Sequence, residues 1–170
     1  MIKPKSITVK EKIIIRKATT KDLESILKLN LELFKKEYRE FDRSLNLDWT
    51  YSKEGREYFK NKIIKKDSFA EVIENNNKIV GYLVGSISKR LFYRKKVKYA
   101  EEEDMIVDKK FRNQGLGTKL IEDFIDWCKK RDIAYISLTA SVKNKSAVHL
   151  YRNLGFKDYN LTLEMELTKK

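Results

Sequence analysis

A glycine-containing turn, Arg112-Asn113-Gln114-Gly115-Leu116-Gly117, constrains this chain more than any other stretch. It follows a strand-like run at 103–107 and opens an amphipathic helical run at 116–128. A helix start leaves several backbone N–H groups without intrahelical partners, and it aims them, with the positive end of the helix dipole, at one point. The sequence therefore predicts a strand–turn–helix unit whose turn can bind an anion.

The residue types in this turn suit a pyrophosphate. Gly115 and Gly117 have no Cβ, so a ligand can approach the backbone closely. Arg112 adds a fixed charge and a fork of donors. The turn lacks the Gly-Lys-Ser/Thr of a P-loop, because Thr118 precedes Lys119. It also lacks the third glycine of a dinucleotide fingerprint. The alternative is a strand–turn–helix connection that binds no ligand, in which the glycines only allow the chain to turn.

A second motif runs from Asn144 to Phe156 and reads as a short helix followed by a strand. Gly155 stands where a left-handed residue would end that helix. Four residues are spaced i, i+3, i+4 and i+7, which places them on one helical face: Ala147, Leu150, Tyr151 and Leu154.

The Arg-x-x-Gly-x-Gly turn and this Asn-(x)6-Tyr-x-x-x-Gly-Phe segment together resemble the GCN5-related N-acetyltransferase (GNAT) superfamily. The run from Glu103 to Asp108 also resembles that family's central strand. The resemblance extends over the segments from about 13 to 167. A length of 170 residues suits one domain, so we expect a single GNAT domain over 1–170 with its core at about 13–167.

Composition describes a globular chain of high charge. Hydrophobic residues make up 41% and charged residues 37%, which excludes a disordered class. The single Cys128 and single His149 exclude a disulfide framework and an ordinary zinc site, so we expect no metal. Cys128 should be packed in its helix, and His149 should lie on the outer face of the later one. The N-terminal 12 residues lack the apolar core of a signal peptide, so we expect a cytoplasmic protein without a membrane partner.

The net charge of +13 has a plain explanation in solvated surface lysines. The excess of positive charge is unevenly distributed along the sequence. Phe92 and Tyr93 lie within the densest group of basic residues. That group is either a polar hairpin end or a nucleic-acid or ribosome patch, and we do not count nucleic acid among the expected partners. Its members are Lys89, Arg90, Arg94, Lys95, Lys96 and Lys98.

Periodicity predicts an α/β fold: a mixed, mostly antiparallel twisted central sheet of about 6–7 strands, flanked by about 4 helices on both faces. This order is similar to the GNAT fold. The expected strands lie at 12–17, 68–73, 78–88, 99–107 and 133–139, with a final strand pair around 156 and 161–167. The expected helices begin near Thr20, at Ser52 (to about 65), at Leu116 and near Asn144.

The resemblance implies how acetyl-CoA, the expected co-substrate, would bind. In the family, the fourth and fifth strands splay apart, and the pantetheine arm inserts there like an added strand. The backbone groups of Met105, Ile106 and Val107 would then bind that arm. Asn144 and Tyr151 would also touch the cofactor. The residues of the turn that would bind the pyrophosphate are Arg112, Asn113, Gln114, Gly115, Leu116, Gly117 and Thr118.

The resemblance also implies two catalytic residues. Tyr151 matches the family tyrosine that protonates the thiolate leaving group, for which a phenol of pKa near 10 is suited. Glu103 aligns best with the acid that some members use, through ordered water, to deprotonate the amine. Glu101, Glu102 and Asp104 stay open as alternatives. Strand alternation puts Glu101 and Glu103 on one face, and Glu102 and Asp104 on the other.

The expected acceptor is a primary amine: a small amine or polyamine, or a protein amine. In the family the first two helices and their connection form the acceptor site. Acids and aromatics in that region suit an ammonium group: Glu37, Glu40, Asp42 and Asp48, with Tyr38, Phe41, Trp49 and Tyr51. We thus expect direct acetyl transfer in a ternary complex. The alternatives are a non-catalytic acyl-CoA sensor or a basic nucleic-acid or ribosome-associated module. A homodimer is compatible with the sequence.

Overall fold

The computed structural model describes residues 12–88, 95–165 and 167. The chain forms two compact units, which divide between Thr139 and Ala140. The first unit contains a five-stranded sheet, whose strands are β1 (Ile13–Lys17), β2 (Ser68–Asn75), β3 (Lys78–Ser88), β4 (Tyr99–Val107) and β5 (Tyr135–Ser137). The basic group expected at Lys89–Lys98 lies partly outside the described residues.

The sheet has the strand order β1-β2-β3-β4-β5. The first three pairings are antiparallel, and β4 pairs with β5 in parallel. The mixed, mostly antiparallel sheet is confirmed. The count of 6–7 strands was too high, because the described residues after Asn153 contain no strand. The described residues of the expected final pair, around 156 and at 161–167, form no strand, because no pairing along the sheet involves them.

Four α-helices accompany the strands: α1 (Leu23–Glu40), α2 (Lys53–Ile64), α3 (Leu116–Lys129) and α4 (Lys145–Asn153). Short 3-10 turns precede α1, α2 and α3, at Thr20–Asp22, Trp49–Tyr51 and Lys109–Phe111. Ser52 caps α2 by accepting the Gly55 N–H at 3.1 Å, as the sequence predicts. Helix α1 runs through Glu40, so it includes residues at which the apolar period fades.

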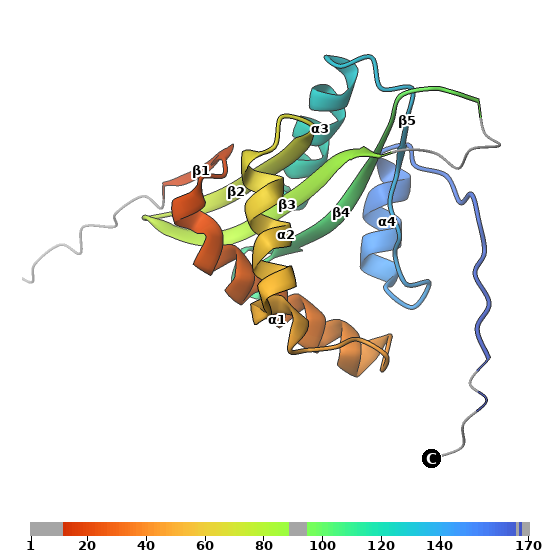
Figure 1. The fold of residues 1–170 in the computed structure, drawn as a ribbon, viewed down its shortest axis with the longest axis horizontal. Coiled ribbons are helices and arrows are strands. Elements are labelled where there is room, and N and C mark those ends of the chain that lie inside the picture. Colours follow the sequence, from red (N-terminus) through yellow and green to blue (C-terminus); the bar gives the residue numbers. More distant parts are fainter. Residues whose placement is uncertain (1–11, 89–94, 166, 168–170) are drawn as a thin grey trace, which may run out of the picture. The chain divides into compact units, whose positions relative to one another are not determined.

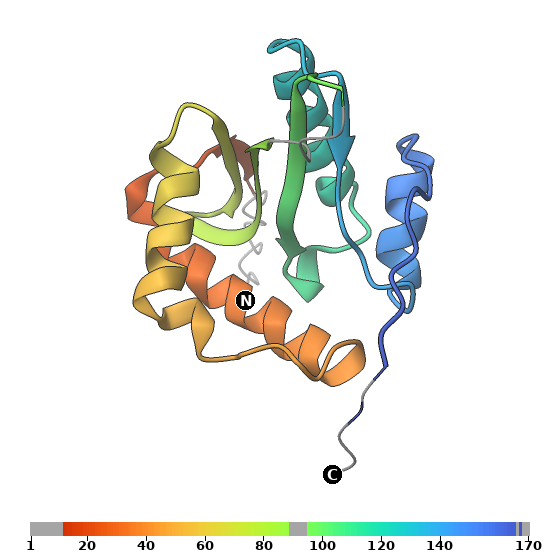
Figure 2. The same cartoon turned by 45° about the vertical axis from the view of Figure 1, so that its right-hand side comes forward.

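Helices cover both faces of the sheet in the first unit (Figures 1 and 2). Helices α1 and α2 pack their apolar side chains on one face, where Ile26, Leu27 and Phe59 join Val72 and Tyr82 in one buried core. On the opposite face, the Phe124 and Trp127 rings of α3 each contact the Phe69 ring of β2. Cys128 is 1% exposed, which confirms that it is packed.

A buried polar network fixes α1 on the sheet. The Asn30 side chain of α1 donates to the Tyr82 hydroxyl at 3.1 Å and accepts from the Thr50 hydroxyl at 2.7 Å. All three residues are fully buried, so each needs these partners. The network therefore ties α1 to β3 and to the segment before α2, and it sets the position of the helices that lie over β4.

Candidate functional site

Strand β4 carries a bulge at Glu103. Val84 of β3 pairs with Asp104, but the next residue, Gly85, pairs with Glu102, so Glu103 is one extra residue in β4. Gly85 favours this arrangement because a Cβ there would lie 2.6 Å from the Glu101 carbonyl oxygen and 2.8 Å from the Phe124 ring. A bulge re-aims the side chains that follow it along the strand.

The bulge overturns the expected alternation of the four acids. Glu101 and Asp104 share the α1/α2 face with their partners Ser86 and Val84, whereas Glu102 shares the α3 face with Gly85. Glu103 also points to the α1/α2 face, where it meets α2. Asp104 was expected opposite Glu103, and that expectation was wrong. Two adjacent carboxylates therefore lie on one side of the sheet.

The Glu103 carboxylate accepts hydrogen bonds from three side chains. Lys62 donates to Oε1 at 2.5 Å, and Ser86 donates to the same oxygen at 2.5 Å. Tyr58 donates to Oε2 at 2.5 Å. The Lys62 and Glu103 side chains are 13% and 18% exposed, so this ion pair is shielded from bulk water. Glu103 thus anchors α2 to β3 and β4.

Tyr58, Lys62 and Ser86 are functional candidates that the sequence did not reveal. Their helical and strand spacing shows only that they lie on inward-facing positions of α2 and β3. Lys62 also lies 5.0 Å from the Tyr58 ring centroid, in cation–π geometry. Their convergence on Glu103 depends on how α2 crosses the sheet, which no local pattern encodes.

Asp104 has a different environment from its neighbour. It is half-buried, and burial together with the nearby acids Glu102 and Glu37 raises its pKa to about 8. Burial likewise raises the pKa of Glu37 on α1. Asp104 in turn helps to raise the pKa of the Tyr58 and Tyr82 hydroxyls, so it lies near both. A carboxyl with a raised pKa is a stronger base once it has lost its proton.

The outer edge of β4 is open over most of its length. Strand β5 pairs with β4 only at Tyr99, Ala100 and Glu101, and no described strand continues that pairing to Val107. The Asp108 N–H bonds to Val80 of β3, so by alternation Ile106 directs its backbone groups toward β3. Met105 and Val107 direct theirs at the open edge, where the Val107 carbonyl accepts from Arg112 Nε at 2.8 Å.

The turn after β4 leaves donors unused at the start of α3. Gly115 is the N-cap residue with φ of 77°, and a Cβ there would meet nothing within 4 Å. The first helical hydrogen bond is from Lys119 N–H to the Gly115 carbonyl, and no side chain caps the helix. The N–H groups of Leu116, Gly117 and Thr118 therefore have no intrahelical partners. Residues 112–115, which include Asn113 and Gln114, are exposed.

The second unit contains the other two predicted site residues on α4. Asn144 caps the helix as expected, because its side chain accepts the Ala147 N–H at 3.4 Å. Tyr151 is 8% exposed, and its ring contacts Phe156 at 5.8 Å between centroids. Gly155 ends the helix with φ of 93°. His149 lies exposed, as predicted.

Several aromatics expected at the acceptor site already face cations of this chain. Arg43 lies 5.0 Å from the Tyr38 ring, and Lys36 and Arg56 lie 5.5 Å from the Phe41 and Tyr51 rings. Trp49 stacks on Phe34 and meets Tyr58 edge-on. The acids of the connection, Glu40, Asp42 and Asp48, are exposed. In this region, Glu37 is the expected acid that lies near Asp104.

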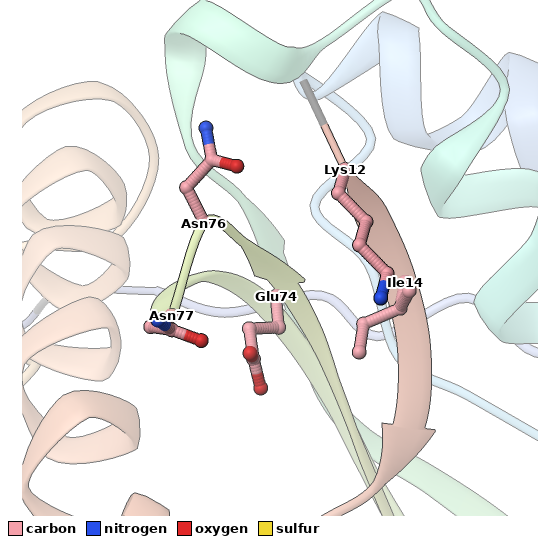
Figure 3. Close-up of a pocket in the computed structure, with 5 residues that line it drawn as sticks. All are labelled: Lys12, Ile14, Glu74, Asn76 and Asn77. Carbon is pink, nitrogen blue, oxygen red and sulfur yellow. The ribbon is translucent and has the colours of Figure 1, made fainter. Parts of the chain in front are cut away.

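A polar hollow of about 280 Å³ lies at another part of the sheet (Figure 3). Its lining comes from the start of β1 and the residue before it, and from the end of β2 and the turn that follows; none of the predicted site residues belongs to it. The lining residues are Lys12, Ile14, Glu74, Asn76 and Asn77. Within the described ranges, no helix is long and apolar enough to cross a membrane.

Comparison with known proteins identifies the family. Residues 28–156 match the model of the acetyltransferase (GNAT) family. The chain is 34% identical over 152 residues to an uncharacterised N-acetyltransferase of Methanocaldococcus jannaschii. This match covers 85% of this chain and 60% of that protein. A shorter match of 55 residues, 38% identical, covers 32% of this chain and 37% of the ribosomal protein bS18-alanine N-acetyltransferase of Escherichia coli.

The fold agrees with solved members of this class. The PaiA N-acetyltransferase of Thermoplasma acidophilum, solved in complex with coenzyme A, superposes with a TM-score of 0.75 at 20% identity, over 89% of this chain and 93% of that one. The chain belongs to the GNAT acetyltransferase family. The matches span 60% and 37% of the lengths of the Methanocaldococcus jannaschii and Escherichia coli relatives.

Proposed function

We propose that this chain is an acetyl-CoA-dependent N-acetyltransferase that moves an acetyl group directly to a primary amine in a ternary complex. One observation carries the proposal: the open edge of β4 leads straight into a turn with three unpartnered N–H groups. An extended acyl-pantetheine chain can bond to the outward groups of Met105 and Val107, as an added strand does. Its pyrophosphate then reaches the start of α3 and Arg112.

The residues around the bulge supply the proton chemistry of the acceptor. An ammonium group must lose a proton before its nitrogen can attack the thioester carbonyl. We assign the base to Asp104, with Glu103 as the residue that positions α2 beside it. The raised pKa of Asp104 favours proton uptake, whereas three donors already occupy the oxygens of Glu103. A proton passes to Asp104 directly or through one water.

Tyr151 completes the proposal as the acid that protonates the departing thiolate. The assignment rests on its place in the Asn-(x)6-Tyr-x-x-x-Gly-Phe motif and on the family to which the chain belongs. The acceptor is a primary amine, and the acids Glu37 and Asp104 favour one that arrives as a cation. The cytoplasmic location expected from the sequence is part of the same proposal.

An acceptor screen tests the function. Purified chain with acetyl-CoA is assayed for free thiol release over polyamines, aminoglycosides, lysine peptides and peptides with free N-termini. We expect acceptor-dependent release for at least one class, with the product identified by a mass increase of one acetyl group. Binding of acetyl-CoA with no transfer to any amine would instead favour the acyl-CoA sensor.

The pH dependence tests Asp104 as the base. Because its pKa is raised to about 8, the activity should rise with pH through about 8, and Asp104→Asn should abolish that rise. The folded state keeps this proton at pH values where the unfolded state has lost it, so stability falls as pH rises toward about 8. Asp104→Asn should therefore be more stable than the parent at pH 9, and this difference should shrink as the pH falls toward 4.

Glu71 offers a matched control on the opposite face of the sheet. Burial raises its pKa to about 7. Glu71→Gln should show a smaller gain in stability of the same sign at high pH, and unchanged activity. If Glu103→Gln, rather than Asp104→Asn, removes the pH dependence of activity, the base is Glu103, as the sequence alone predicts.

A further inference from the structure

Two neighbouring carboxyl groups of β4 lie on the same side of the sheet. The bulge turns Glu103 toward the α1/α2 face, which Asp104 also faces. Like charges on adjacent side chains oppose each other, so one of the two groups holds its proton more tightly unless a cation balances the other. Which acid takes up a proton from an acceptor therefore depends on where the nearest cation lies.

Lys62 of α2 supplies that cation, and it contacts Glu103. Its Nζ donates to Glu103 Oε1 at 2.5 Å and to the Ser86 hydroxyl at 2.9 Å. The Tyr58 ring lies on another side of the same ammonium group. These contacts fix the position of the charge. Both side chains of the ion pair are largely shielded from water, so solvent screens their attraction only weakly.

Tethering of α2 does not by itself explain an ion pair at this place. Two charges must leave water to form it, and apolar residues of similar size often stabilise a protein as well or better. An apolar contact between positions 62 and 103 would therefore hold α2 on the sheet equally well. The charges themselves call for a role, and the neighbouring carboxyl group of Asp104 provides one.

The groups around Asp104 come from four elements of the first unit. Burial, Glu102, Glu37 and Glu103 raise the pKa of Asp104, in decreasing order of effect, and Lys62 lowers it. Lys62 thus acts on both acids, but its direct contact is with Glu103. The titratable groups near Asp104 are Glu37 of α1, Tyr58 and Lys62 of α2, Tyr82 of β3, and Glu102 and Glu103 of β4.

We propose that Lys62 is a positioning residue that directs proton transfer to Asp104 by neutralising Glu103. The inference rests on the proposed function, in which a proton leaves the acceptor nitrogen and binds a carboxylate oxygen of Asp104. Lys62 and Glu103 together carry no net charge, so Asp104 has a neutral ion pair beside it in place of a second anion. Different surroundings give two neighbouring carboxyl groups different proton affinities, and hence different roles.

Two charge-removing variants should move the pH midpoint of activity in opposite directions. Lys62→Met leaves Glu103 as an anion to which Tyr58 and Ser86 still donate, so the midpoint should rise by about one pH unit. Glu103→Gln leaves the Lys62 cation unbalanced, so the midpoint should fall by about the same amount. The double variant Lys62→Met/Glu103→Gln has neither charge, and its midpoint should return close to that of the parent chain.

Ser86→Ala is the matched control for the loss of a hydrogen bond. It removes a donor to the Glu103 oxygen that Lys62 contacts and changes no charge, so the midpoint should move far less than in Lys62→Met. Lys62→Arg keeps the charge and should keep the midpoint. Circular dichroism verifies that each variant is folded. If Lys62→Met does not fold, Lys62→Gln, which retains a donor, removes the charge in its place.

Carbon-13 NMR of the aspartate carboxyl groups separates this inference from the proposed function. It follows the titration of Asp104 in the folded chain without an acceptor, and Asp104→Asn identifies the signal. The same opposite shifts should appear there. Expected NMR shifts without acetyl transfer to any amine would contradict the proposed function alone. Single variants that shift the NMR midpoint in one direction or not at all, or an activity midpoint that does not follow the NMR midpoint, would overturn the role of Lys62.

Discussion

The two motifs on which the family resemblance rests use their glycines in opposite ways. At the start of α3, Gly115 has φ of 77°, and the next three N–H groups have no helical partners. At the end of α4, Gly155 has φ of 93°, and the N–H groups that follow the helix are bonded to its last carbonyls. One left-handed residue leaves donors open for a ligand, and the other closes a helix on itself.

The two motifs therefore contribute in different ways: the first through backbone N–H groups that can bind a ligand, and the second through a side chain that can take part in the reaction. The turn at 112–118 needs its conformation more than its side chains, because N–H groups supply most of its donors. The helix of the second unit has both of its ends satisfied, by Asn144 and by the Schellman motif. Its proposed contribution to catalysis therefore rests on one hydroxyl, that of Tyr151.

Tyr151→Phe should have the largest effect on turnover. If the hydroxyl protonates the thiolate, kcat should fall by about 10²–10⁴, the usual range for a positioned proton donor. KM for acetyl-CoA should change far less, because the lost interaction acts mainly in the transition state. Steady-state kinetics measures both. Tyr135→Phe, a change at a tyrosine of β5 that is 53% exposed, is the control. Normal turnover by Tyr151→Phe would leave the second motif with a structural role only.

Gly117→Glu should remove cofactor binding while the chain stays folded. A carboxylate would occupy the helix start and oppose the anion that the unpartnered N–H groups attract, lowering CoA affinity by about 100-fold or more. Calorimetry measures this loss, and Lys129→Glu, at the far end of the same helix, serves as the charge control. Undiminished affinity in a folded Gly117→Glu protein would place the cofactor elsewhere.

Cofactor binding should also protect the fold. A ligand held only by the native state at ~100 times its dissociation constant adds about 2.7 kcal/mol to the free energy of unfolding. A thermal scan should therefore show stabilisation by acetyl-CoA and by CoA, and none by ATP or NAD at the same concentration. Equal shifts from ATP and CoA would reduce the turn to a general phosphate site.

Gly115→Ala and Gly155→Ala compare the two glycines directly. Each forces a Cβ into the left-handed region, at a cost of about 1–2 kcal/mol in the free energy of unfolding. Denaturant titration should give similar losses, since both positions have open space around the added Cβ. Only Gly115→Ala should also weaken CoA binding. A matching loss of affinity in Gly155→Ala would remove the distinction between the two turns.

Periodicity and turn chemistry predicted most of the first unit from the sequence. The strand from Lys78 to Ser88, the cap at Ser52 and the start of α3 after Gly115 agree with the structure. These features depend on residues close in sequence, so local patterns suffice. The prediction of a final strand pair was wrong for the described residues. A period of two predicts an extended segment but does not specify a strand with which it pairs.

The site shows the same limit at the level of side chains. The turn at 112–118 could be predicted because its donors come from consecutive residues. The partners of Glu103 could not, since Tyr58 and Lys62 are 45 and 41 residues away and reach it only through the packing of α2. The bulge itself is specified jointly by β4 and by Gly85 of the neighbouring strand.

The bulge at Glu103 reverses which of the odd- and even-numbered residues of β4 face α1 and α2. Before it, odd-numbered residues such as Glu101 face α1 and α2; after it, even-numbered residues such as Asp104 and Ile106 do. A mutational library intended to change the amine preference should therefore randomise odd positions upstream and even positions downstream. Deleting the single codon for residue 103 would restore regular alternation, and Glu101, Glu102 and Asp104 would keep their present faces, because they would then pair with three consecutive residues of β3.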